Sequence, residues 1–330
     1  MAEPHGIREN LLTGGHAIVA PGRAAVSLGP DALSGLPKLA GACPFCPGHE
    51  PDTDVALALT PTEGPWAVRV VRNKYPALHA EPPELPPPSG GRSIPGFGHH
   101  EVVVESPEHD GDVATYPEEH ARRLFEVLRD RVAAAESLAG IGHVSLFRNR
   151  GQRAGASQPH PHSQIVASPV PGLEQAIRWE RALGHYAALG TNLLDDVLAS
   201  ELEAGARIVE EDANVVVLVP FAPQRTFECW VVPRRARGSI SAVDDATLRS
   251  LSRLLPRAIR RALGATGRTD YNLLFRLPPV AHRHHPAAFW YVEVLPRGTL
   301  FAGFELVSGM PLIYASPEAT AARYRDFVLP

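Results

Sequence analysis

The chain contains little cysteine. Three of its 330 residues are cysteines, and two of them, Cys43 and Cys46, share one Cys-x-x-Cys segment. Proteins built around disulfide bonds carry several cysteine pairs, usually in a shorter chain. The count therefore argues against a disulfide framework and for a metal or redox site at the paired cysteines.

Long hydrophobic runs and an excess of positive charge are also missing. No eighteen consecutive apolar residues occur, and the N-terminus, MAEPHGIREN, lacks the apolar core of a secretion signal. We therefore expect a cytoplasmic protein without a membrane segment. The formal net charge of −4 gives no support for binding nucleic acid through its phosphates.

A pattern of strand, strand, helix, strand, strand occurs twice. With 44% hydrophobic and 21% charged residues, the chain is an ordinary globular one, long enough for one large domain or two smaller ones. The repeated order predicts a duplicated α+β unit, divided into residues 1–170 and 171–330, with a long helical stretch over 171–204. The expected elements are 66–73, 101–107, 117–138, 143–147 and 160–164, and then 214–220, 228–233, 244–263, 271–275 and 289–293.

The most informative segment is FRNRGQRAGASQPHPHSQIVASP, residues 147–169. A loop rich in Gly and Ala leads into His160, His162 and Gln164, which share one face if they belong to a strand. Two imidazoles and an amide beside a loop of free backbone N–H groups suit chemistry on a phosphate. The alternative is a histidine-containing strand in an ordinary core, and the loop, the spacing and the distant cysteine pair favour the phosphate site.

The Cys-x-x-Cys segment allows two interpretations. Two thiolates at this spacing can bind one tetrahedral metal ion, which needs two further ligands. A redox pair of the thioredoxin type would instead open a helix after a strand. Proline and glycine flank Cys43 and Cys46, so we favour the metal. His49 is a possible further ligand, although histidines further along the chain are better placed.

The second half keeps the strand pattern but loses the imidazoles. Phe289, Tyr291 and Glu293 occupy the positions of His160, His162 and Gln164. We therefore expect one active site per chain, in the first half. The loop His282-Arg283-His284-His285 could bind a metal, but its flanking prolines favour a solvated or phosphate-proximal loop.

These segments together resemble the galactose-1-phosphate uridylyltransferase family, a branch of the histidine triad superfamily, over nearly the whole chain. The resemblance implies two tandem histidine-triad-like units with antiparallel sheets flanked by helices, of which the first is catalytic and the second degenerate. The matching segments are LTGGHAIVAPGRA (12–24), CPFC (43–46), RNKYPAL (72–78), VVVESPEHD (102–110), FRNRGQRAGASQPHPHSQIVA (147–167) and GFEL (303–306).

The resemblance implies a structural Zn²⁺ ion, one per chain. Its ligands would be Cys43, Cys46, His109 and His160, which complete a tetrahedron and leave no position open for water. A second metal site is expected to be absent, because Tyr291 stands where a histidine ligand would be. Whether the ion is zinc or iron stays open.

The resemblance also implies covalent catalysis by His162. Its ring nitrogen would attack the α-phosphorus of a nucleotide sugar and release sugar 1-phosphate, and an acceptor would then take the nucleotide from the histidine. Gln164 would hydrogen-bond a phosphoryl oxygen. The implied substrate-binding residues are Arg23, Asn73, Lys74, Asn149, Gly155, Ser157, Phe304 and Glu305. Arg23 would contact phosphate, and the family implies a homodimer in which Arg23 reaches the neighbouring subunit.

Several departures from the family pattern concern the substrate. The segments at 72–78 and 155–164 are closer to the branch of ADP-glucose and dinucleoside-polyphosphate phosphorylases than to the uridylyltransferases. At four positions this chain has another residue than the family, namely Val26 for an arginine, Lys74 for an aspartate, Ala156 for a cysteine and Ser163 for a glycine. The position of a family lysine in the sugar-phosphate loop falls near Thr299.

Three functions follow as hypotheses. The first is a hexose-1-phosphate uridylyltransferase of galactose metabolism, which exchanges a nucleotide between UDP-hexose and sugar 1-phosphate through His162. The second is a phosphorylase of ADP-glucose or dinucleoside polyphosphates, in which inorganic phosphate is the acceptor. The third is a zinc-stabilised nucleotide-binding protein without catalysis. The base and the sugar stay open at this point.

Overall fold

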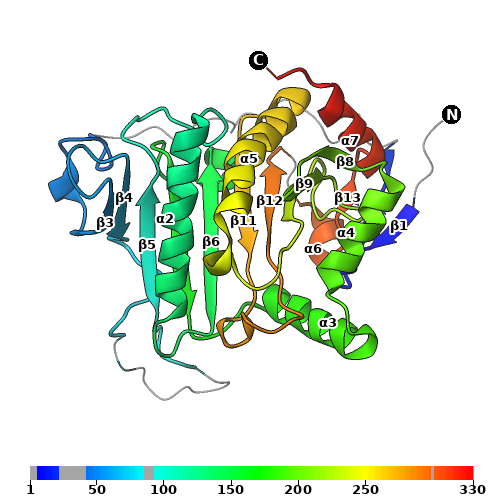
Figure 1. Ribbon diagram of the computed structural model, residues 1–330, viewed down its shortest axis with the longest axis horizontal. Coiled ribbons are helices and arrows are strands. Elements are labelled where there is room, and N and C mark those ends of the chain that lie inside the picture. The colour runs from blue at the N-terminus through cyan, green and yellow to red at the C-terminus, as the bar shows by residue number, and fades with distance from the viewer. Residues whose placement is uncertain (1–5, 22–41, 83, 85–92, 299–300, 330) are drawn as a thin grey trace.

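A computed structural model describes residues 6–21, 42–82, 84, 93–298 and 301–329 (Figure 1). Arg23, Val26 and Thr299 lie outside these residues. Elements are named as in Figure 1.

One ten-stranded sheet runs through both halves of the chain. Every neighbouring pair in it is antiparallel. The described architecture is thus the expected α+β class with an antiparallel sheet. The strand order is β3 (Ala56–Thr60), β4 (Val68–Arg72), β5 (His99–Val104), β7 (His162–Ser168), β6 (His143–Arg150), β11 (Tyr271–Arg276), β12 (Tyr291–Pro296), β10 (Cys229–Pro233), β9 (Val215–Leu218) and β8 (Ile208–Glu211).

The sheet is arranged symmetrically about its centre. β6 and β11 pair in the middle, with Asn149 opposite Asn272, and each half contributes five strands in mirrored order. A smaller sheet contains β1 (Gly6–Glu9), β2 (His16–Val19) and β13 (Leu312–Ile313), and in it β2 and β13 run parallel.

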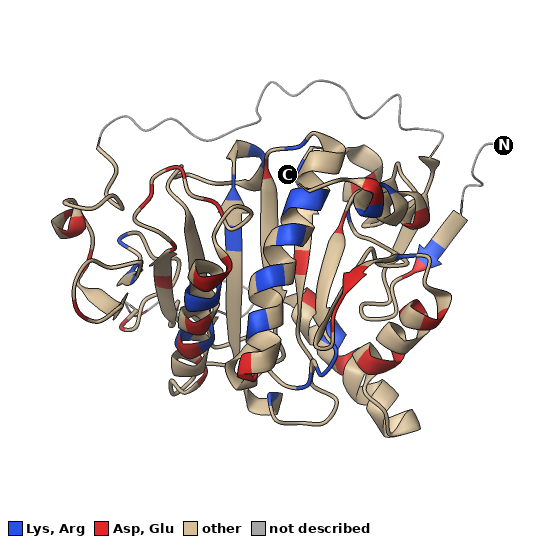
Figure 2. Ribbon diagram, turned by 45° about the horizontal axis from the view of Figure 1, so that its top comes forward, with Lys and Arg blue, Asp and Glu red and all other residues tan. Residues whose placement is uncertain are grey.

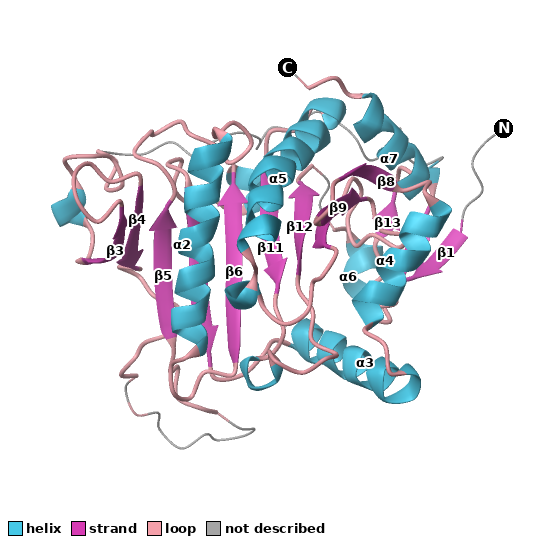
Figure 3. Cartoon of the chain, viewed as in Figure 1, coloured by secondary structure: helices cyan, strands magenta, loops and turns pink. Residues whose placement is uncertain are grey.

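Two long helices cover one face of the large sheet. Figures 1 and 3 show α2 (Glu118–Glu136) and α5 (Asp245–Thr266) side by side across the strands. Their apolar stripes pack on alternate strand residues such as Val103, Ile165 and Leu273, which form the main core. Figure 2 shows basic residues along α5. Arg257 and Arg261 of this helix pair with Glu210 of β8. This leaves the opposite face of the sheet for other contacts.

The opposite face is covered differently in the two halves. In the second half, α3 (Leu173–Leu189) and α4 (Leu193–Ala204) pack over it around Trp230 and Tyr291. The single helical stretch expected over 171–204 is wrong, because Gly190 ends α3 in a left-handed conformation and the Asn192 side chain caps α4 by accepting from the Leu194 N–H. Two short helices, α6 (Gly303–Ser308) and α7 (Pro317–Asp326), follow near the C-terminus.

None of the helices in the described ranges combines the length and the apolar character needed to cross a membrane.

Candidate active site and metal cluster

The two histidines of the His-Pro-His segment have separate surroundings. β7 begins at His162, so His162 and Gln164 lie on the strand and His160 lies in the loop before it. The expectation that all three share one strand therefore fails at His160. Pro161 has no N–H to donate to the sheet, and its carbonyl instead accepts from the Glu105 N–H at 3.1 Å. His160 is thereby free to turn toward the cysteines.

Cys43, Cys46, His109 and His160 form one cluster. One ligand atom from each residue lies within 4.8 Å of the others. Nδ1 of His160 is 3.6 Å from both sulfurs, and Nδ1 of His109 is 3.3 Å from Sγ of Cys46. Zn–S and Zn–N bonds of about 2.3 and 2.0 Å at a tetrahedral angle would separate sulfur from nitrogen by about 3.5 Å. The four implied ligands thus fit one tetrahedral ion.

The protonation of His160 also suits a ligand. Its Nε2 lies 2.8 Å from the carbonyl oxygen of Ser106, which can only accept, so Nε2 carries the proton. Nδ1 is then the nitrogen with a free lone pair, and it faces the cysteines. A backbone carbonyl on the distal nitrogen is a usual partner of a metal-bound histidine.

The loop of the Cys-x-x-Cys segment is held by the strand beneath it. Arg69 of β4 is buried and donates to the carbonyl oxygen of Pro44 and to Oγ1 of Thr53. Trp66 donates from its indole to Glu50 at 2.9 Å. His49, the other possible ligand, pairs with Asp52 and is outside the cluster. This support orients the two sulfurs toward His160.

His162 is buried, with 6% of its surface exposed, and has one free ring nitrogen. Its Nδ1 lies 2.9 Å from the carbonyl oxygen of His160, so Nδ1 carries the proton and Nε2 has the lone pair. Burial lowers the pKa of His162 below its ordinary value. The ring is thus neutral, with its free lone pair on Nε2.

Gln164 has a partner that sequence reasoning missed. Its Oε1 lies 2.8 Å from Nε2 of His100 on β5, and the Asn73 amide lies next to the same ring. The pairing of Val104 with His162 and of Val102 with Gln164 puts His100 on the same sheet face. Strand alternation could have given the face of His100, but only the pairing of β5 with β7 gives its neighbour.

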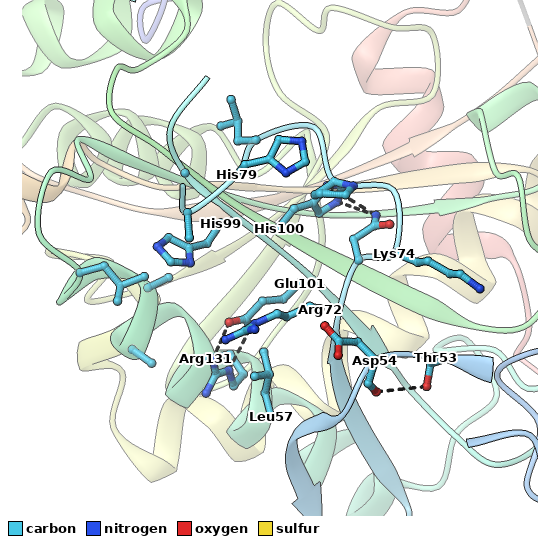
Figure 4. Close-up of a pocket in the computed structure, with 18 of the residues that line it drawn as sticks. Thr53, Asp54, Leu57, Arg72, Lys74, His79, His99, His100, Glu101 and Arg131 are labelled. Carbon is cyan, nitrogen blue, oxygen red and sulfur yellow. Dashed lines mark hydrogen bonds and ion pairs between the residues drawn. The ribbon is translucent and has the colours of Figure 1, made fainter. Parts of the chain in front are cut away.

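A large cavity opens beside His100. It has a volume of about 1010 Å³ and lies at the end of β4 and the beginning of β5. Figure 4 shows the rings of His99 and His100 on different sides of β5, with Lys74 on the adjoining loop. The cavity walls include Asn73, Lys74, His79, His99, His100 and Arg131.

Comparison with known proteins gives this geometry a context. The family model described as galactose-1-phosphate uridyl transferase, N-terminal domain, matches residues 34–171, which contain the cluster, His162 and Gln164. This match supports the galactose-1-phosphate uridylyltransferase family for the chain.

Two relatives match different shares of the chain. ADP-glucose phosphorylase of Arabidopsis thaliana is 28% identical over 87% of this chain and 82% of its own length. Galactose-1-phosphate uridylyltransferase of Streptomyces lividans is also 28% identical, over 66% of this chain, and the match spans only 56% of that relative.

Two solved structures share the fold. The structure of Arabidopsis thaliana ADP-glucose phosphorylase with bound ADP-glucose is 25% identical and has a TM-score of 0.84, covering 99% of this chain and all of that one. A uridylyltransferase structure is 25% identical with a TM-score of 0.76, covering 98% and 97%.

Asn149 and the loop after it lie beside β7. The register puts Asn149 on the same sheet face as His162, and its Oδ1 accepts from Nδ2 of Asn272 at 2.8 Å. Asn272 also donates to the carbonyl of Ala154, which fixes the loop. Gly155 has a φ of 81°, a conformation that strains any residue with a Cβ, and Ser157 is exposed.

Two of the implied substrate residues lie away from this site. Phe304 and Glu305 belong to α6, which Figure 1 shows beside β13 in the other half of the molecule. Glu305 accepts from the backbone N–H of Ala302, and Phe304 is 42% exposed. Within one chain, the structure does not bring them to His162.

A buried charged network lies on the helix-covered side of β7. Arg148 donates from Nε to both carboxylate oxygens of Glu105 at 3.0 Å, and Ser163 donates to the same carboxylate at 2.7 Å. Arg148 also donates to the hydroxyl of Tyr271, which donates to Asp112. The network fixes the segment that carries Glu105 and Ser106, both of which contact the His-Pro-His loop.

In the second half, the positions that correspond to His162 and Gln164 are buried by packing. Tyr291 is fully buried and donates to Glu293, which pairs with Arg276. In the adjoining loop, the ring of His282 stacks on Trp179. Among the described residues, the only group that could hold a metal ion is the cluster of Cys43, Cys46, His109 and His160.

Proposed function

We propose that the chain is a nucleotidyltransferase that carries the nucleotide on Nε2 of His162. The observation that supports this most is the bond from Nδ1–H of His162 to the His160 carbonyl, which leaves Nε2 free. Nε2 forms a bond to the α-phosphorus of a nucleotide sugar, the bond from that phosphorus to the bridging oxygen breaks, and sugar 1-phosphate leaves. A phosphate oxygen of the acceptor then attacks the same phosphorus, and the N–P bond breaks.

The neighbouring groups have matching roles in this proposal. The carbonyl of His160 stabilises the positive charge that develops on the ring of His162. Gln164 and the N–H groups around Gly155 and Ser157 donate to phosphoryl oxygens. Asn73, Lys74 and Asn149 contact the nucleotide.

The preferred donor is ADP-glucose and the preferred acceptor is inorganic phosphate, so that the products are ADP and glucose 1-phosphate. The likeness to ADP-glucose phosphorylase supports this choice, because it extends over more of both chains than the likeness to the uridylyltransferase. Uridylyl transfer from UDP-hexose to hexose 1-phosphate is the second candidate, which the matching family model supports.

Intact-mass spectrometry tests both candidates. After incubation with ADP-glucose, we expect the mass of the protein to rise by one nucleoside monophosphate, and addition of phosphate should discharge it as ADP. Labelling by UDP-glucose with discharge by hexose 1-phosphate would establish the second candidate instead. No adduct with any nucleotide sugar or dinucleoside polyphosphate would contradict nucleotidyl transfer and favour a non-catalytic binding protein.

We propose that the ion in the cysteine and histidine cluster is zinc with a structural role. Its four protein ligands would fill the tetrahedron, so it would hold His160 and thereby the carbonyl that contacts His162. The zinc would then act on the reacting histidine only through His160, whose carbonyl accepts from His162, and it would not contact the substrate.

Replacing Cys43 with serine is expected to abolish stoichiometric zinc binding. The remaining three ligands hold the ion weakly, and the folding free energy supplied by the metal is lost, which is of the order of several kcal/mol. Metal content is measured by plasma mass spectrometry, and stability by urea denaturation. The control is His49→Gln, which removes a nearby imidazole outside the cluster. Cys43→Ser with one tightly bound zinc per chain would contradict the assignment.

We also propose a homodimer, because Phe304 and Glu305 lie away from His162 in their own chain and a second copy would supply them to the sugar. Arg23 would contact phosphate across the same interface. The sheet halves centred on β6 and β11 support the division into a catalytic unit, 1–170, and a degenerate repeat, 171–330.

A further inference from the structure

The hydrogen bonds of His100 define its tautomer. The backbone N–H of Ala77 donates to Nδ1 of His100 at 3.1 Å, so Nδ1 has no proton. Nε2 therefore carries the proton of the neutral ring, and it lies 2.8 Å from Oε1 of Gln164. Burial lowers the pKa of His100, which keeps the ring neutral.

The Asn73 amide holds the same ring from its face. Its Nδ2 is 3.1 Å from Nε2 and 3.4 Å from Nδ1 of His100. An atom in the plane of the ring and this close to both nitrogens would collide with a ring carbon, so Nδ2 lies over the face of the ring. Oδ1 of Asn73 accepts from the N–H of Tyr75, which fixes this amide in turn. The imidazole is thus oriented by the loop 73–77.

We propose that His100 is a positioning residue that sets the orientation of the Gln164 amide. The inference rests on the proposed function, in which Gln164 donates to a phosphoryl oxygen. The oxygen and nitrogen of a glutamine amide have nearly the same shape, so packing alone does not distinguish them. Donation from Nε2–H of His100 holds Oε1 of Gln164 toward β5. The NH₂ group of Gln164 is then directed away from His100, on the sheet face that carries His162.

This arrangement makes the donor character of residue 100 decisive. A glutamine at position 100 can still place an N–H near Oε1 of Gln164, although it cannot accept from Ala77. A phenylalanine fills the same space without donating, and the Gln164 amide is free to turn over. A glutamate only accepts, so it draws the NH₂ group of Gln164 toward itself and presents the carbonyl oxygen to the phosphate, where it repels.

The first test reads the tautomer without any substrate. Protein labelled with ¹⁵N-histidine is examined by long-range ¹H–¹⁵N correlation spectroscopy, and His100→Gln assigns the signal of residue 100. We expect the neutral Nε2–H tautomer at neutral pH. The Nδ1–H tautomer, or a charged ring, would overturn the inference whatever the enzyme does.

The second test measures the single-turnover rate of nucleotidyl-enzyme formation. We expect the wild type to be fastest, followed by His100→Gln, then His100→Phe at about 10- to 100-fold below the wild type, and then His100→Glu. His185→Phe is the control, because His185 lies on α3, pairs with Asp196 and does not line the cavity beside His100. Equal rates for the phenylalanine and glutamate variants would contradict a role through amide orientation.

A double-mutant comparison separates orientation from charge and from folding. In a Gln164→Ala background, His100→Phe and His100→Glu should change the rate less than twofold, because no amide remains to be oriented. Persisting full effects would overturn the inference. If the wild type is labelled but the rates of the variants do not follow the expected order, the role of His100 is contradicted and the proposed function is not. If the wild type is not labelled, the proposed function is contradicted, and the tautomer result is unaffected.

Discussion

Replacing His162 with glycine is expected to lower the rate of nucleotidyl transfer by about 10⁴-fold or more. The variant keeps the strand, since β7 pairs with β5 and β6 through backbone groups. It loses the atom that forms the covalent intermediate in the proposed mechanism, and the remaining binding groups can then assist only direct attack by the acceptor. Rapid-quench kinetics and intact-mass spectrometry after incubation with ADP-glucose measure the loss.

The control for this variant is His185→Ala, which removes a histidine of α3 that pairs with Asp196 and does not line the cavity beside His100. It should retain labelling within a few-fold of the wild type. Zinc content should be one ion per chain in both variants, because neither residue is in the metal cluster. A nucleotide adduct on folded His162→Gly protein would identify a different nucleophile and would reject the proposed mechanism.

Replacing Arg148 with methionine is expected to lower the free energy of unfolding by about 3–5 kcal/mol. Arg148 and Glu105 are 2% and 0% exposed at their side chains, so the variant leaves a carboxylate buried without its cation. The hydroxyl of Tyr271 also loses the donor that Arg148 supplied to it. Urea denaturation followed by circular dichroism measures the change.

The same substitution is expected to slow labelling of His162 in the protein that remains folded. Glu105 donates its backbone N–H to the carbonyl of Pro161, and Ser106 accepts from His160, so movement of this segment shifts both imidazoles. Glu105→Gln combined with Arg148→Met should recover part of the stability, because the uncompensated charge is removed. A loss below about 1 kcal/mol in Arg148→Met would contradict the importance of the network.

Much of the fold followed from local pattern. The strands expected over 101–107 and 143–147 and the helix expected over 117–138 correspond to β5, β6 and α2, whose bounds differ from these by at most three residues. The single helix expected over 171–204 failed because Gly190 and Asn192 favour a break, and their local preferences outweighed the continuing apolar pattern. Side-chain capping is a feature of individual residues that an average over a segment conceals.

The candidate site was also predicted only in part from the sequence. The spacing of the cysteines and of His-Pro-His-x-Gln, with the family resemblance, was enough to nominate the cluster and His162. The position of His160 outside β7 was not foreseen, because the pattern shows that residues alternate without showing where sheet pairing begins. Phe304 and Glu305 were grouped with the site by resemblance, although α6 lies in the other half of the molecule.

The sequence by itself determined which groups the proposed site contains, namely two thiolates and two imidazoles for a metal ion, a third imidazole as the proposed nucleophile, and one amide. Only the tertiary structure decided which nitrogen of each ring is free and which way the Gln164 amide points. Those properties depend on the Ser106 and His160 carbonyls, the Ala77 N–H and the imidazole of His100. A histidine takes its tautomer from its hydrogen-bond partners. The pairing of β5 with β7 brings His100 to Gln164 and the segment after β5 to His160, so that groups 64 and 54 residues apart in sequence become partners.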